Sequence, residues 1–228
     1  MKKTAVIAGS TGLIGSHCLT ALLSSGRYGC VRSIVRRPSG VRHPLLDERI
    51  IDFASLNASS TGSADHAFCC LGTTMKQAGS KENFQRVDFH YVTAFARACR
   101  KAGALQFVVV SSIGARAGSS SFYLDVKGRM EDELCRMGFS SLHIFRPSLL
   151  LGDRTERRVG ESAAAVLAKP FSPLMIGPLR PYRPIAASDV GRAMVAAACE
   201  ESAGVHIHYY SDIIRLSARF GSIIPVRM

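Results

Sequence analysis

The sequence of 228 residues lacks tryptophan, Cys-x-x-Cys pairs and any apolar run long enough to span a membrane. The missing tryptophan excludes nothing by itself. The cysteines are odd in number and mostly lie in apolar segments, so a zinc ribbon or thioredoxin-like site is not expected, and buried reduced thiols fit better. Glycines at positions 9, 12 and 15 interrupt the N-terminal apolar stretch, unlike a signal peptide. We therefore predict a soluble cytoplasmic protein.

Acidic residues are scarce: 17 Asp and Glu face 29 Lys and Arg, for a net charge of +12. This balance favours anionic partners. The basic residues are scattered in short clusters, without a long Lys/Arg run or a DNA-binding helix motif, so neither nucleic acid nor a membrane is the expected partner. We interpret the charge as partly solvated surface and partly phosphate handling. With 47% hydrophobic residues, the chain can bury a sizeable core.

Short apolar segments alternate with segments of helical periodicity through the first two thirds of the chain. This alternation predicts an α/β fold: a Rossmann-like, doubly wound, mostly parallel sheet with helices on both faces. We expect a single domain over residues 1–228, with 149–185 as a small substrate-side segment in the C-terminal region. The expected strands are 4–8, 30–35, 49–53, 67–71, 106–110, 141–145 and 206–210, and the expected helices are 13–23, 84–99, 123–137, 161–167 and 188–199. The last ten residues fit no element.

A glycine-rich loop joins the first expected strand to the first expected helix, with the spacing G-x-x-G-x-x-G. Glycines at these places permit a tight turn, close approach of the backbone to a pyrophosphate, and close packing of the helix on the sheet. The helix start offers free N–H groups to phosphates. Because the loop opens a βαβ series, we predict a dinucleotide site rather than an ordinary turn, formed by Gly9, Ser10, Thr11, Gly12, Leu13, Ile14 and Gly15.

No carboxylate follows the second expected strand, where one would bind the ribose 2′-OH of NAD. Arg36 and Arg37 stand there instead. Guanidinium groups suit a 2′-phosphate, so we predict that NADP(H) is preferred over NAD(H). We expect one of the two arginines to contact the phosphate, and the other to be a solvated strand end.

Two further strand ends are expected at the same sheet edge. Asp52 can accept from the adenine amino group with Phe53 beside the ring, although a helix or loop cap explains Asp52 nearly as well. After the fourth strand we expect the backbone to pass along the cofactor, with a glycine allowing close approach, over Cys70, Leu71, Gly72 and Thr73. Cys69 and Cys70 are adjacent on a strand and point to opposite faces, so we interpret them as packing residues.

Four segments in order, AGSTGLIG, VVVSSIGA, YLDVK and FRPSLLLG, carry a family resemblance. The chain resembles the short-chain dehydrogenase/reductase superfamily. More narrowly, it is similar to the atypical NAD(P)H-binding branch that includes proteins like the human Tat-interacting oxidoreductase-like tumour suppressor. The resemblance covers about residues 4 to 210. The Tyr-x-x-x-Lys motif is weak alone and specific in combination with the glycine loop.

The resemblance implies three catalytic residues. Tyr123 would exchange a proton with the substrate oxygen, Lys127 would contact the nicotinamide ribose and lower the pKa of the tyrosine, and Ser112 would orient the carbonyl. The neighbouring Ser111 is the alternative serine, and otherwise a cofactor contact. The physics agrees, because a free tyrosine has a pKa near 10 and a nearby cation moves it toward neutrality. The resemblance also places Pro147 and Ser148 by the nicotinamide amide.

Plainer interpretations exist for several residues. Tyr123 and Lys127 alone would be taken as a surface pair on a helix. The alternating His206 and His208 share a strand face, but without a third ligand we expect half-buried histidines rather than a metal site. Asp88 could lie near the sheet edge, but a solvated helix position is the expectation. A solvated basic loop is the default for three arginines that otherwise suit an anionic substrate or partner: Arg154, Arg157 and Arg158.

We therefore predict an NADP(H)-dependent oxidoreductase that interconverts a carbonyl and an alcohol on a small molecule. Two alternatives stay open. One is an NADPH-binding regulatory or sensor protein with little turnover, because the related branch includes such members. The other is an NAD-dependent epimerase or dehydratase, against which the two arginines at positions 36 and 37 argue. A homodimer is the assembly considered, and no metal is expected.

Overall fold

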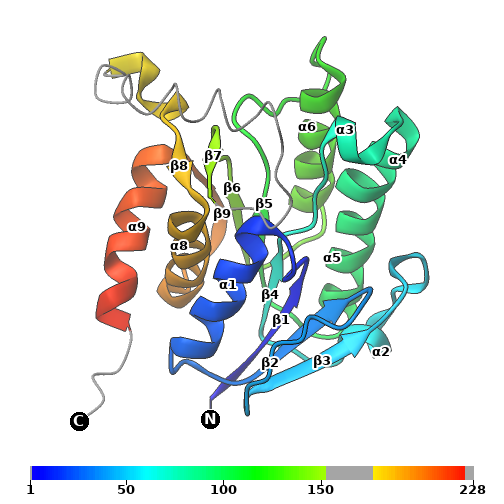
Figure 1. Cartoon of the computed structure of the whole chain (residues 1–228), viewed down its shortest axis with the longest axis vertical. Helices are drawn as coiled ribbons and strands as arrows, with labels where there is room; N and C mark the ends of the chain where they lie inside the picture. Colours follow the sequence, from blue (N-terminus) through cyan, green and yellow to red (C-terminus); the bar gives the residue numbers. More distant parts are fainter. Residues whose placement is uncertain (1, 153–176, 224–228) are drawn as a thin grey trace.

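The fold is a parallel sheet with helices on both faces, as a computed structural model describes it for residues 2–152 and 177–223 (Figure 1). Within these residues seven strands form one sheet in the order β3-β2-β1-β4-β5-β6-β9, with every pair parallel. The chain winds outward from β1 in both directions, so the predicted Rossmann-like class is confirmed. The strands are β1 (Lys3–Ala8), β2 (Tyr28–Val35), β3 (Leu46–Ile50), β4 (His66–Cys69), β5 (Gln106–Val110), β6 (Ser141–Phe145) and β9 (Gly204–His208).

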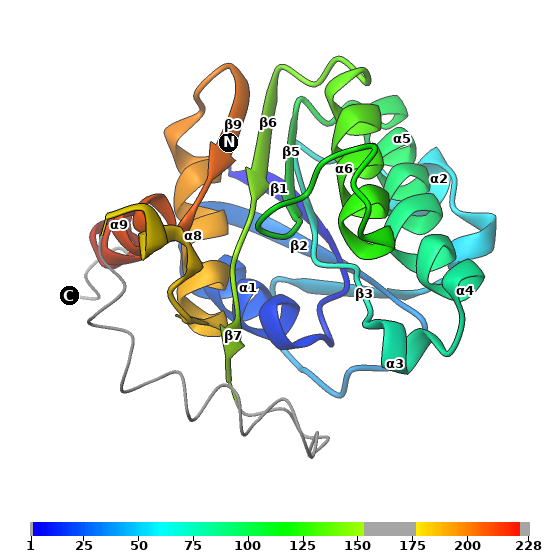
Figure 2. The same cartoon turned by 90° about the horizontal axis from the view of Figure 1, so that it is seen from above.

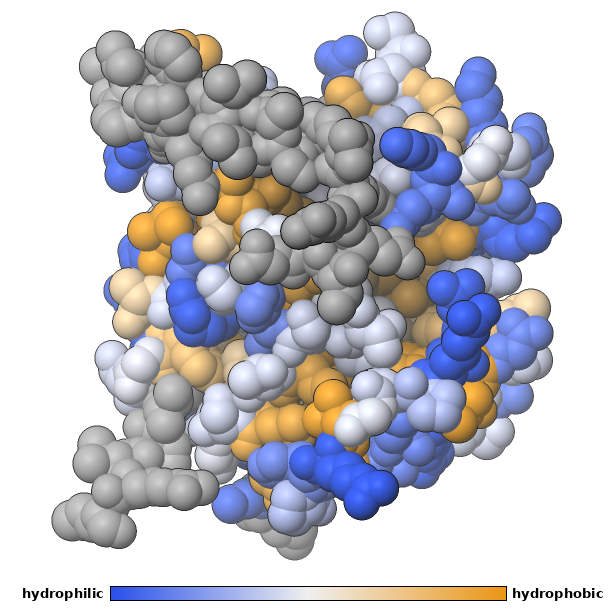
Figure 3. Space-filling model, in the orientation of Figure 1, coloured by the Kyte–Doolittle hydropathy of each residue, from blue (hydrophilic) through white to orange (hydrophobic). Residues whose placement is uncertain are grey.

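Helices cover the sheet from two sides, as the view from above shows (Figure 2). One side carries α1 (Leu13–Ser24), α8 (Ala187–Glu200) and α9 (Tyr210–Ile223). The other carries α2 (Ala58–Thr61), α5 (Val92–Lys101) and α6 (Phe122–Cys135). Two short helices, α3 (Met75–Ala78) and α4 (Lys81–Gln85), lie at the end of α5, where Figure 3 shows hydrophilic residues on the surface.

The buried side chains form two cores, one on each face of the sheet. Successive residues of β1 alternate between them: Ile7 packs toward α1 and α8, and Val6 packs toward α5. Both are fully buried, which is expected for a central parallel strand covered on both faces. The sheet is therefore held rigidly between two helical layers, and the loops at its carboxyl edge are placed accurately.

The third strand lies three residues earlier than predicted, at Leu46–Ile50 rather than 49–53. Its sequence, LDERI, is half exposed and charged, as suits the edge strand of a sheet. A search for apolar runs passes over such a strand. The strand ends because Asp52 caps a 3-10 turn at Phe53–Ser55, where its side chain accepts a hydrogen bond from the N–H of Ala54.

The helix predicted over 84–99 is interrupted by a π-helical turn at Arg86–Tyr91, between α4 and α5. The turn shifts the buried stripe, so that Asp88 is fully buried while Val87 is only half buried. The expectation that Asp88 is solvated is wrong. Such π turns often lie at functional sites.

The C-terminal part differs most from the prediction. The last strand, β9, lies two residues earlier than expected, and α9 follows it at once. This helix was not predicted, yet it buries Ile213, Leu216 and Phe220 at helical spacing. Short strands β7 (Leu150–Leu151) and β8 (Ile185–Ala186) pair beside the main sheet, and a 3-10 helix occupies Gly177–Tyr182. The helix expected at 161–167 and the arginine cluster Arg154, Arg157 and Arg158 lie outside the described residues. In the described residues, no helix has the length and apolar character needed to cross a membrane.

Candidate cofactor and active site

The predicted site residues meet at the carboxyl edge of the sheet. Because the strands are parallel, the segments that follow β1, β4, β5 and β6 all leave the sheet at this edge. The winding direction changes between β1 and β4, and doubly wound sheets bind ligands at that switch point. The backbone of Cys70 and Leu71 after β4 runs within a few ångströms of Gly9 after β1.

The glycine loop has the geometry of a phosphate cradle. Gly9 has φ +82°, and a Cβ there would lie 2.6 Å from the Cys70 carbonyl group. A Cβ at Gly15 would lie 1.9 Å from the Gly9 oxygen, so both glycines are required by the fold itself. Gly12 is different, because the nearest atom to a Cβ at that position would be the Gly9 oxygen, at 3.3 Å, and the residue is exposed. Among the described residues, a Cβ at Gly12 would have no second neighbour within 4 Å, so the loop is open on this side.

Helix α1 begins at this loop with donors available. Gly12 is its N-cap, and no side chain of the described residues caps the helix. The first turn therefore directs backbone N–H groups and the positive end of the helix dipole outward, which suits a pyrophosphate. The residues present fit the phosphates of a dinucleotide.

Not every loop residue is placed to touch a ligand. The hydroxyl groups of Ser10 and Ser33 are 2.7 Å apart and buried, so Ser10 fastens the loop to β2. Ile14 is 7% exposed and belongs to the core beneath α1. Thr11 is exposed and Leu13 half buried, so these two remain the side chains available at the loop surface.

Arg36 and Arg37 directly follow β2 and are both exposed. Neither guanidinium forms a hydrogen bond or an ion pair within residues 2–152 and 177–223. By contrast, Arg32 within the same strand is tied to Asp47 at 2.8 Å. As far as the described residues show, these two guanidinium groups at the strand end are unpaired and could bind an anion.

The capping alternative holds for Asp52, whose Oδ1 accepts from the Ala54 N–H at 3.0 Å while the residue stays exposed. Phe53 is 4% exposed, and its ring centroid lies 5.8 Å from that of Tyr91. The Phe53 ring belongs to the core, so its placement beside an adenine is corrected: burial against the π-helical turn keeps it there.

Cys69 and Cys70 point to opposite faces, as expected: Cys69 is part of the α5-side core and Cys70 packs against the α1-side core. Burial raises the pKa of the Cys69 thiol to about 12. A hydrogen bond with Cys18, followed by burial, raises the pKa of Cys70 well above its usual range. Both thiols are protonated packing groups, and the loop beyond them, Leu71 to Thr73, is at least partly exposed.

Tyr123 and Lys127 lie one turn apart on α6, and the Lys127 side chain reaches the loop after β4. Tyr123 is half buried, with its ring centroid 5.4 Å from that of Phe84. Lys127 is 4% exposed, and its Nζ lies 2.8 Å from Oδ1 of Asp88. Burial opposes its charge, but the Asp88 carboxylate and the Tyr123 phenol outweigh burial, so the pKa of Lys127 lies above its ordinary value. The surface-pair interpretation is wrong for Lys127, because its side chain is buried and paired with Asp88.

The structure separates the two serines after β5. Ser111 is buried and donates its hydroxyl hydrogen bond to Oε1 of Glu131. Glu131 in turn pairs with Arg146, whose Nη2 lies 2.5 Å from Oε2. Arg146 also donates to the Tyr209 hydroxyl at 2.8 Å. Ser111 is thereby committed to an internal network. Ser112 is half buried, and the one hydrogen bond that its hydroxyl forms with the described residues goes to the Ile113 carbonyl, at 3.4 Å.

Pro147 and Ser148 follow β6 at the same edge. Pro147 is buried, and its carbonyl accepts from the Ile113 N–H at 3.0 Å. Ser148 donates its hydroxyl hydrogen bond to the Arg183 carbonyl. These bonds fasten the segment after β6 to the loop after β5 and to the chain before β8.

His206 and His208 stack with His143 on neighbouring strands rather than forming an open metal site. The ring centroids of His143 and His208 are 5.2 Å apart, and their nitrogens meet at 2.9 Å. Burial lowers the pKa of His143 to about 3 and that of His208 to about 4, so both are neutral. In the described ranges, no cluster of three or more His, Cys, Asp or Glu could hold a metal ion.

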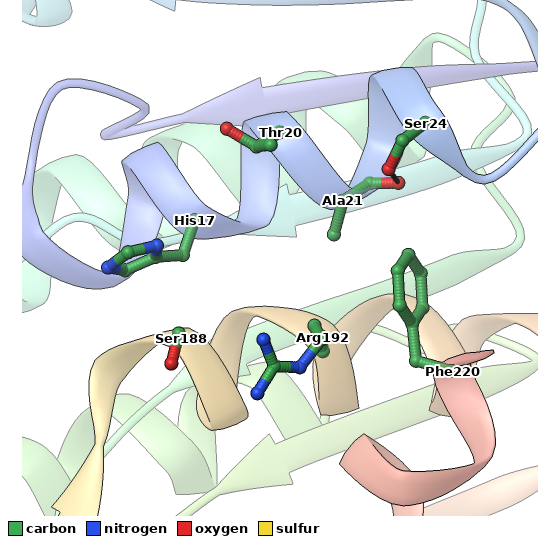
Figure 4. Close-up of a pocket in the computed structure, with 7 residues that line it drawn as sticks. All are labelled: His17, Thr20, Ala21, Ser24, Ser188, Arg192 and Phe220. Carbon is green, nitrogen blue, oxygen red and sulfur yellow. Dashed lines mark hydrogen bonds between the residues drawn. The ribbon is translucent and has the colours of Figure 1, made fainter.

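A surface hollow lies away from this edge, between α1 and the helices α8 and α9 (Figure 4). His17 and Thr20 of α1 face Ser188 and Arg192 of α8 across it, and Phe220 of α9 closes one end. Arg192 is already bound to Asp189 at 2.6 Å and to Ser217 at 3.1 Å. The hollow contains none of the predicted site residues.

A family model described as NAD(P)H-binding matches residues 9–172, so the chain belongs to this NAD(P)H-binding family. Its relatives include "Protein FMP52, mitochondrial" of Candida albicans, 32% identical over 83% of this chain and 85% of the relative. The protein HTATIP2 of Rattus norvegicus is 35% identical over 70% of this chain and 67% of its own length. The resemblance to the atypical branch of short-chain dehydrogenase/reductases is confirmed.

Solved structures support the fold alone. MoeE5 in complex with UDP-glucuronic acid and NAD has a TM-score of 0.68 at 18% identity, covering 96% of this chain and 82% of MoeE5. The UDP-glucose 4-epimerase of Thermotoga maritima, solved with UDP-glucose, has a TM-score of 0.65 at 16% identity, covering 96% and 82%. Both have the nucleotide-binding Rossmann-like architecture that the sheet order indicates.

The predicted cytoplasmic location is wrong. Relatives from Candida albicans, Aspergillus niger and Scheffersomyces stipitis are all named as mitochondrial proteins. Neither reduced cysteines nor a missing signal peptide distinguishes the cytosol from another compartment with reduced thiols.

Proposed function

We propose that the protein is an NADP(H)-dependent oxidoreductase of the short-chain dehydrogenase/reductase type, which interconverts a carbonyl and an alcohol on a small molecule. One observation carries the proposal: Lys127, a buried ammonium, lies one helical turn from Tyr123 and beside the loop after β4, at the edge where the glycine cradle opens. Burying a charged group costs free energy, and proteins commonly bury such groups at functional sites.

The nicotinamide, when bound, supplies the hydride. Tyr123 donates the proton to the carbonyl oxygen in reduction and accepts it in oxidation. Lys127 places its positive charge beside the Tyr123 phenol and donates hydrogen bonds to the ribose. Ser112 donates to the carbonyl oxygen, a role that its half-buried hydroxyl leaves open and that Ser111, bound to Glu131, does not share.

The preference for NADP(H) is supported by Arg36 and Arg37. Both are exposed at the end of β2, where the adenosine ribose of a dinucleotide lies in Rossmann-like folds, and neither has an acidic partner in the described part of the chain. A guanidinium pairs with a 2′-phosphate through two parallel hydrogen bonds.

The test is to measure NADPH and NADH binding by fluorescence and then to screen carbonyl substrates with wild type and Tyr123→Phe. We expect tighter binding of NADPH, and a loss of about 10²–10⁴ in kcat/KM for Tyr123→Phe with unchanged NADPH affinity. Equal activity of the variant would remove Tyr123 from the mechanism. Tight NADPH binding without turnover on any carbonyl would favour the sensor alternative.

The epimerase or dehydratase alternative is favoured by one observation: structures with this fold include MoeE5, solved with NAD and UDP-glucuronic acid, and a UDP-glucose 4-epimerase. It requires NAD(H) to be retained through the reaction. NADH binding tighter than NADPH binding, together with turnover of a nucleotide sugar, would replace the oxidoreductase proposal by this one.

A further inference from the structure

Asp88 is a buried carboxylate that sequence reasoning assigned to solvent. It is 0% exposed and lies in the π-helical turn Arg86–Tyr91 that interrupts α4 and α5. In an uninterrupted α-helix, the buried face would consist of apolar side chains and would not include Asp88. The π turn instead directs an ionisable group inward at the carboxyl edge of the sheet, next to the proposed proton-transfer residues.

The two oxygens of Asp88 join two separate segments of the site. Oδ1 lies 2.8 Å from Nζ of Lys127 on α6. Oδ2 accepts a hydrogen bond from the backbone N–H of Thr73, also at 2.8 Å. The chain passes so close that a Cβ at Gly72 would lie 3.3 Å from Oδ1 and 3.7 Å from Nζ of Lys127. One carboxylate thus links the lysine to the loop that follows β4.

The charged state of Lys127 depends on this contact. Its side chain is almost fully buried, which by itself favours the neutral amine. Three titratable groups face it: Asp88 from the π-helical turn, Tyr123 from α6 and Cys69 from β4. Burial keeps the Cys69 thiol protonated, with its pKa raised to about 12, and the Asp88 carboxylate pairs with Nζ of Lys127 at 2.8 Å. Asp88 is the group among the three that supplies a full negative charge.

We propose that Asp88 is a positioning residue, which holds Lys127 as an ammonium at the cofactor edge and fixes it to the backbone of Gly72 and Thr73. This inference rests on the proposed function for the role of Lys127 toward the nicotinamide ribose. The contacts of Asp88 join the lysine and the loop into one unit at the proposed cofactor edge. Binding then costs less ordering of these groups than it would in their absence.

The first test follows the lysine without any cofactor. The chain has seven lysines, so ¹³C-labelled lysine gives a simple NMR spectrum, and the Lys127 signal is identified by its loss in Lys127→Met. We expect Lys127 to titrate at higher pH than the exposed lysines in wild type and at lower pH than they do in Asp88→Asn. An unchanged Lys127 titration in Asp88→Asn would overturn the proposal.

Asp125→Asn is the matched control. Asp125 is also a carboxylate next to a basic side chain and a backbone donor: it accepts from the Gly118 N–H at 2.8 Å and pairs with Arg129 at 3.4 Å. It lies on α6 two residues before Lys127. The Lys127 titration should not change in this variant, and an equal change in both variants would also overturn the proposal.

The second test is a double-mutant cycle on NADPH binding with Asp88→Asn, Lys127→Met and the variant carrying both. At alkaline pH we expect Asp88→Asn to weaken NADPH binding by about tenfold or more, since a charged hydrogen-bond donor to the ribose is lost. In the Lys127→Met background the same change should alter the Kd by less than about twofold. An equal loss in both backgrounds would mean that Asp88 acts through the loop alone and would overturn the proposal.

These outcomes separate the inference from the function on which it rests. If wild type binds no NADPH, the proposed function fails, while the lysine titration still decides whether Asp88 holds Lys127 charged. If Asp88→Asn does not fold, the double variant decides: folding of that variant supports an uncompensated Lys127 charge as the cause. Failure of the double variant to fold would overturn the proposal.

Discussion

The parallel strands of the central sheet all begin at one edge, the amino edge, and end at the opposite one, the carboxyl edge. Polar side chains are buried at both edges, but their hydrogen-bond and ion-pair partners differ. At the amino edge, the Tyr28 hydroxyl meets Nδ1 of His66 at 2.9 Å, Nε2 of His66 meets Lys3 at 3.3 Å, and Lys3 pairs with Glu201 at 2.5 Å. Each group finds its partner inside the protein. At the carboxyl edge, the backbone donors that begin α1 have no capping side chain in the described ranges, and Arg36 and Arg37 have no partner there.

This difference shows which polar groups serve the fold and which serve a ligand. A buried donor must be satisfied, so the amino-edge chain and the Ser111–Glu131–Arg146 network are explained by folding alone. Donors at the mouth of a glycine cradle that have no partner among the described residues suit an anionic ligand. The Lys127–Asp88 pair belongs to both groups, because its two charges are paired inside the protein and it lies where the cofactor is expected.

The largest expected effect comes from Gly15→Ala. Its Cβ would lie 1.9 Å from the Gly9 oxygen, so the cradle cannot keep its shape, and we expect a loss of about 4 kcal/mol or more in the free energy of unfolding. Urea denaturation measures this loss. Gly12→Ala is the control: its Cβ meets only the Gly9 oxygen, at 3.3 Å, so it should fold nearly normally but bind NADPH weakly. Equal stability losses would contradict the distinction.

The next effect concerns the carboxyl-edge network. Arg146→Met leaves Glu131, which is 4% exposed, without its cation, and we expect a loss of about 3–5 kcal/mol in the free energy of unfolding. Arg97→Met breaks an ion pair of similar length, 2.6 Å between Arg97 and Glu133, but the Arg97 side chain is 53% exposed. This variant should lose less than about 1 kcal/mol in the free energy of unfolding. Chemical denaturation compares the two, and similar losses would show that burial does not decide the effect.

Acid should weaken the amino edge. His66 is neutral in the folded protein because burial and then the Lys3 charge lower its pKa to about 4, against about 6.5 when unfolded. The unfolded chain therefore binds a proton first as pH falls below about 6.5, and the free energy of unfolding decreases until about pH 4, by about 3 kcal/mol for this group. Urea unfolding at several pH values measures the slope.

Two variants assign that slope. His66→Gln keeps a hydrogen-bonding group for Tyr28 and should make the dependence on pH shallower, while His17→Gln, an exposed histidine on α1, should leave it unchanged. His143 and His208 contribute in the same direction, since burial lowers their pKa values to about 3 and about 4. A slope that is the same in His66→Gln would exclude His66 as its source.

The smallest expected effect is on cofactor choice. Arg36→Ala and Arg37→Ala should each leave stability unchanged, because both side chains are exposed, and one of them should reduce the preference for NADPH over NADH by about tenfold or more. Fluorescence titration with both cofactors measures this ratio. Arg42→Ala, an exposed arginine after the same strand, is the control. An unchanged ratio in both variants would remove the arginines from the 2′-phosphate site.

The sequence predicted the alternation of strands and helices because central strands such as β1 and β5 are continuous apolar runs and α5 carries a clear apolar stripe. It placed the edge strand β3 three residues too late, because the residues of that strand are polar where one side faces solvent. It also missed α9, since Ile213, Leu216 and Phe220 are too few to stand out without the helix α8 on which they pack. A periodic pattern identifies a strand or helix only when apolar residues recur regularly along that segment itself.

The candidate site divides in the same way. Glycine spacing and the Tyr-x-x-x-Lys motif are local patterns, so the cradle and Lys127 were located from the sequence with their neighbours in the chain. Asp88 was not, although an acidic residue inside an apolar stripe was a signal. The choice between Ser111 and Ser112 could not be made either, because the partner of Ser111 is Glu131, twenty residues away.

The sequence by itself therefore determined the parallel Rossmann-like order, the glycine cradle and the place of the two arginines after β2, since each depends on residues close together in the chain. Tertiary structure alone decided that Asp88 turns inward, that Ser111 is committed to Glu131 and that Phe53 lies in the core. These outcomes depend on distant segments meeting at one sheet edge. A buried polar side chain forms hydrogen bonds or ion pairs with the groups next to it in the folded protein, and the order of residues in the chain does not show which groups these are.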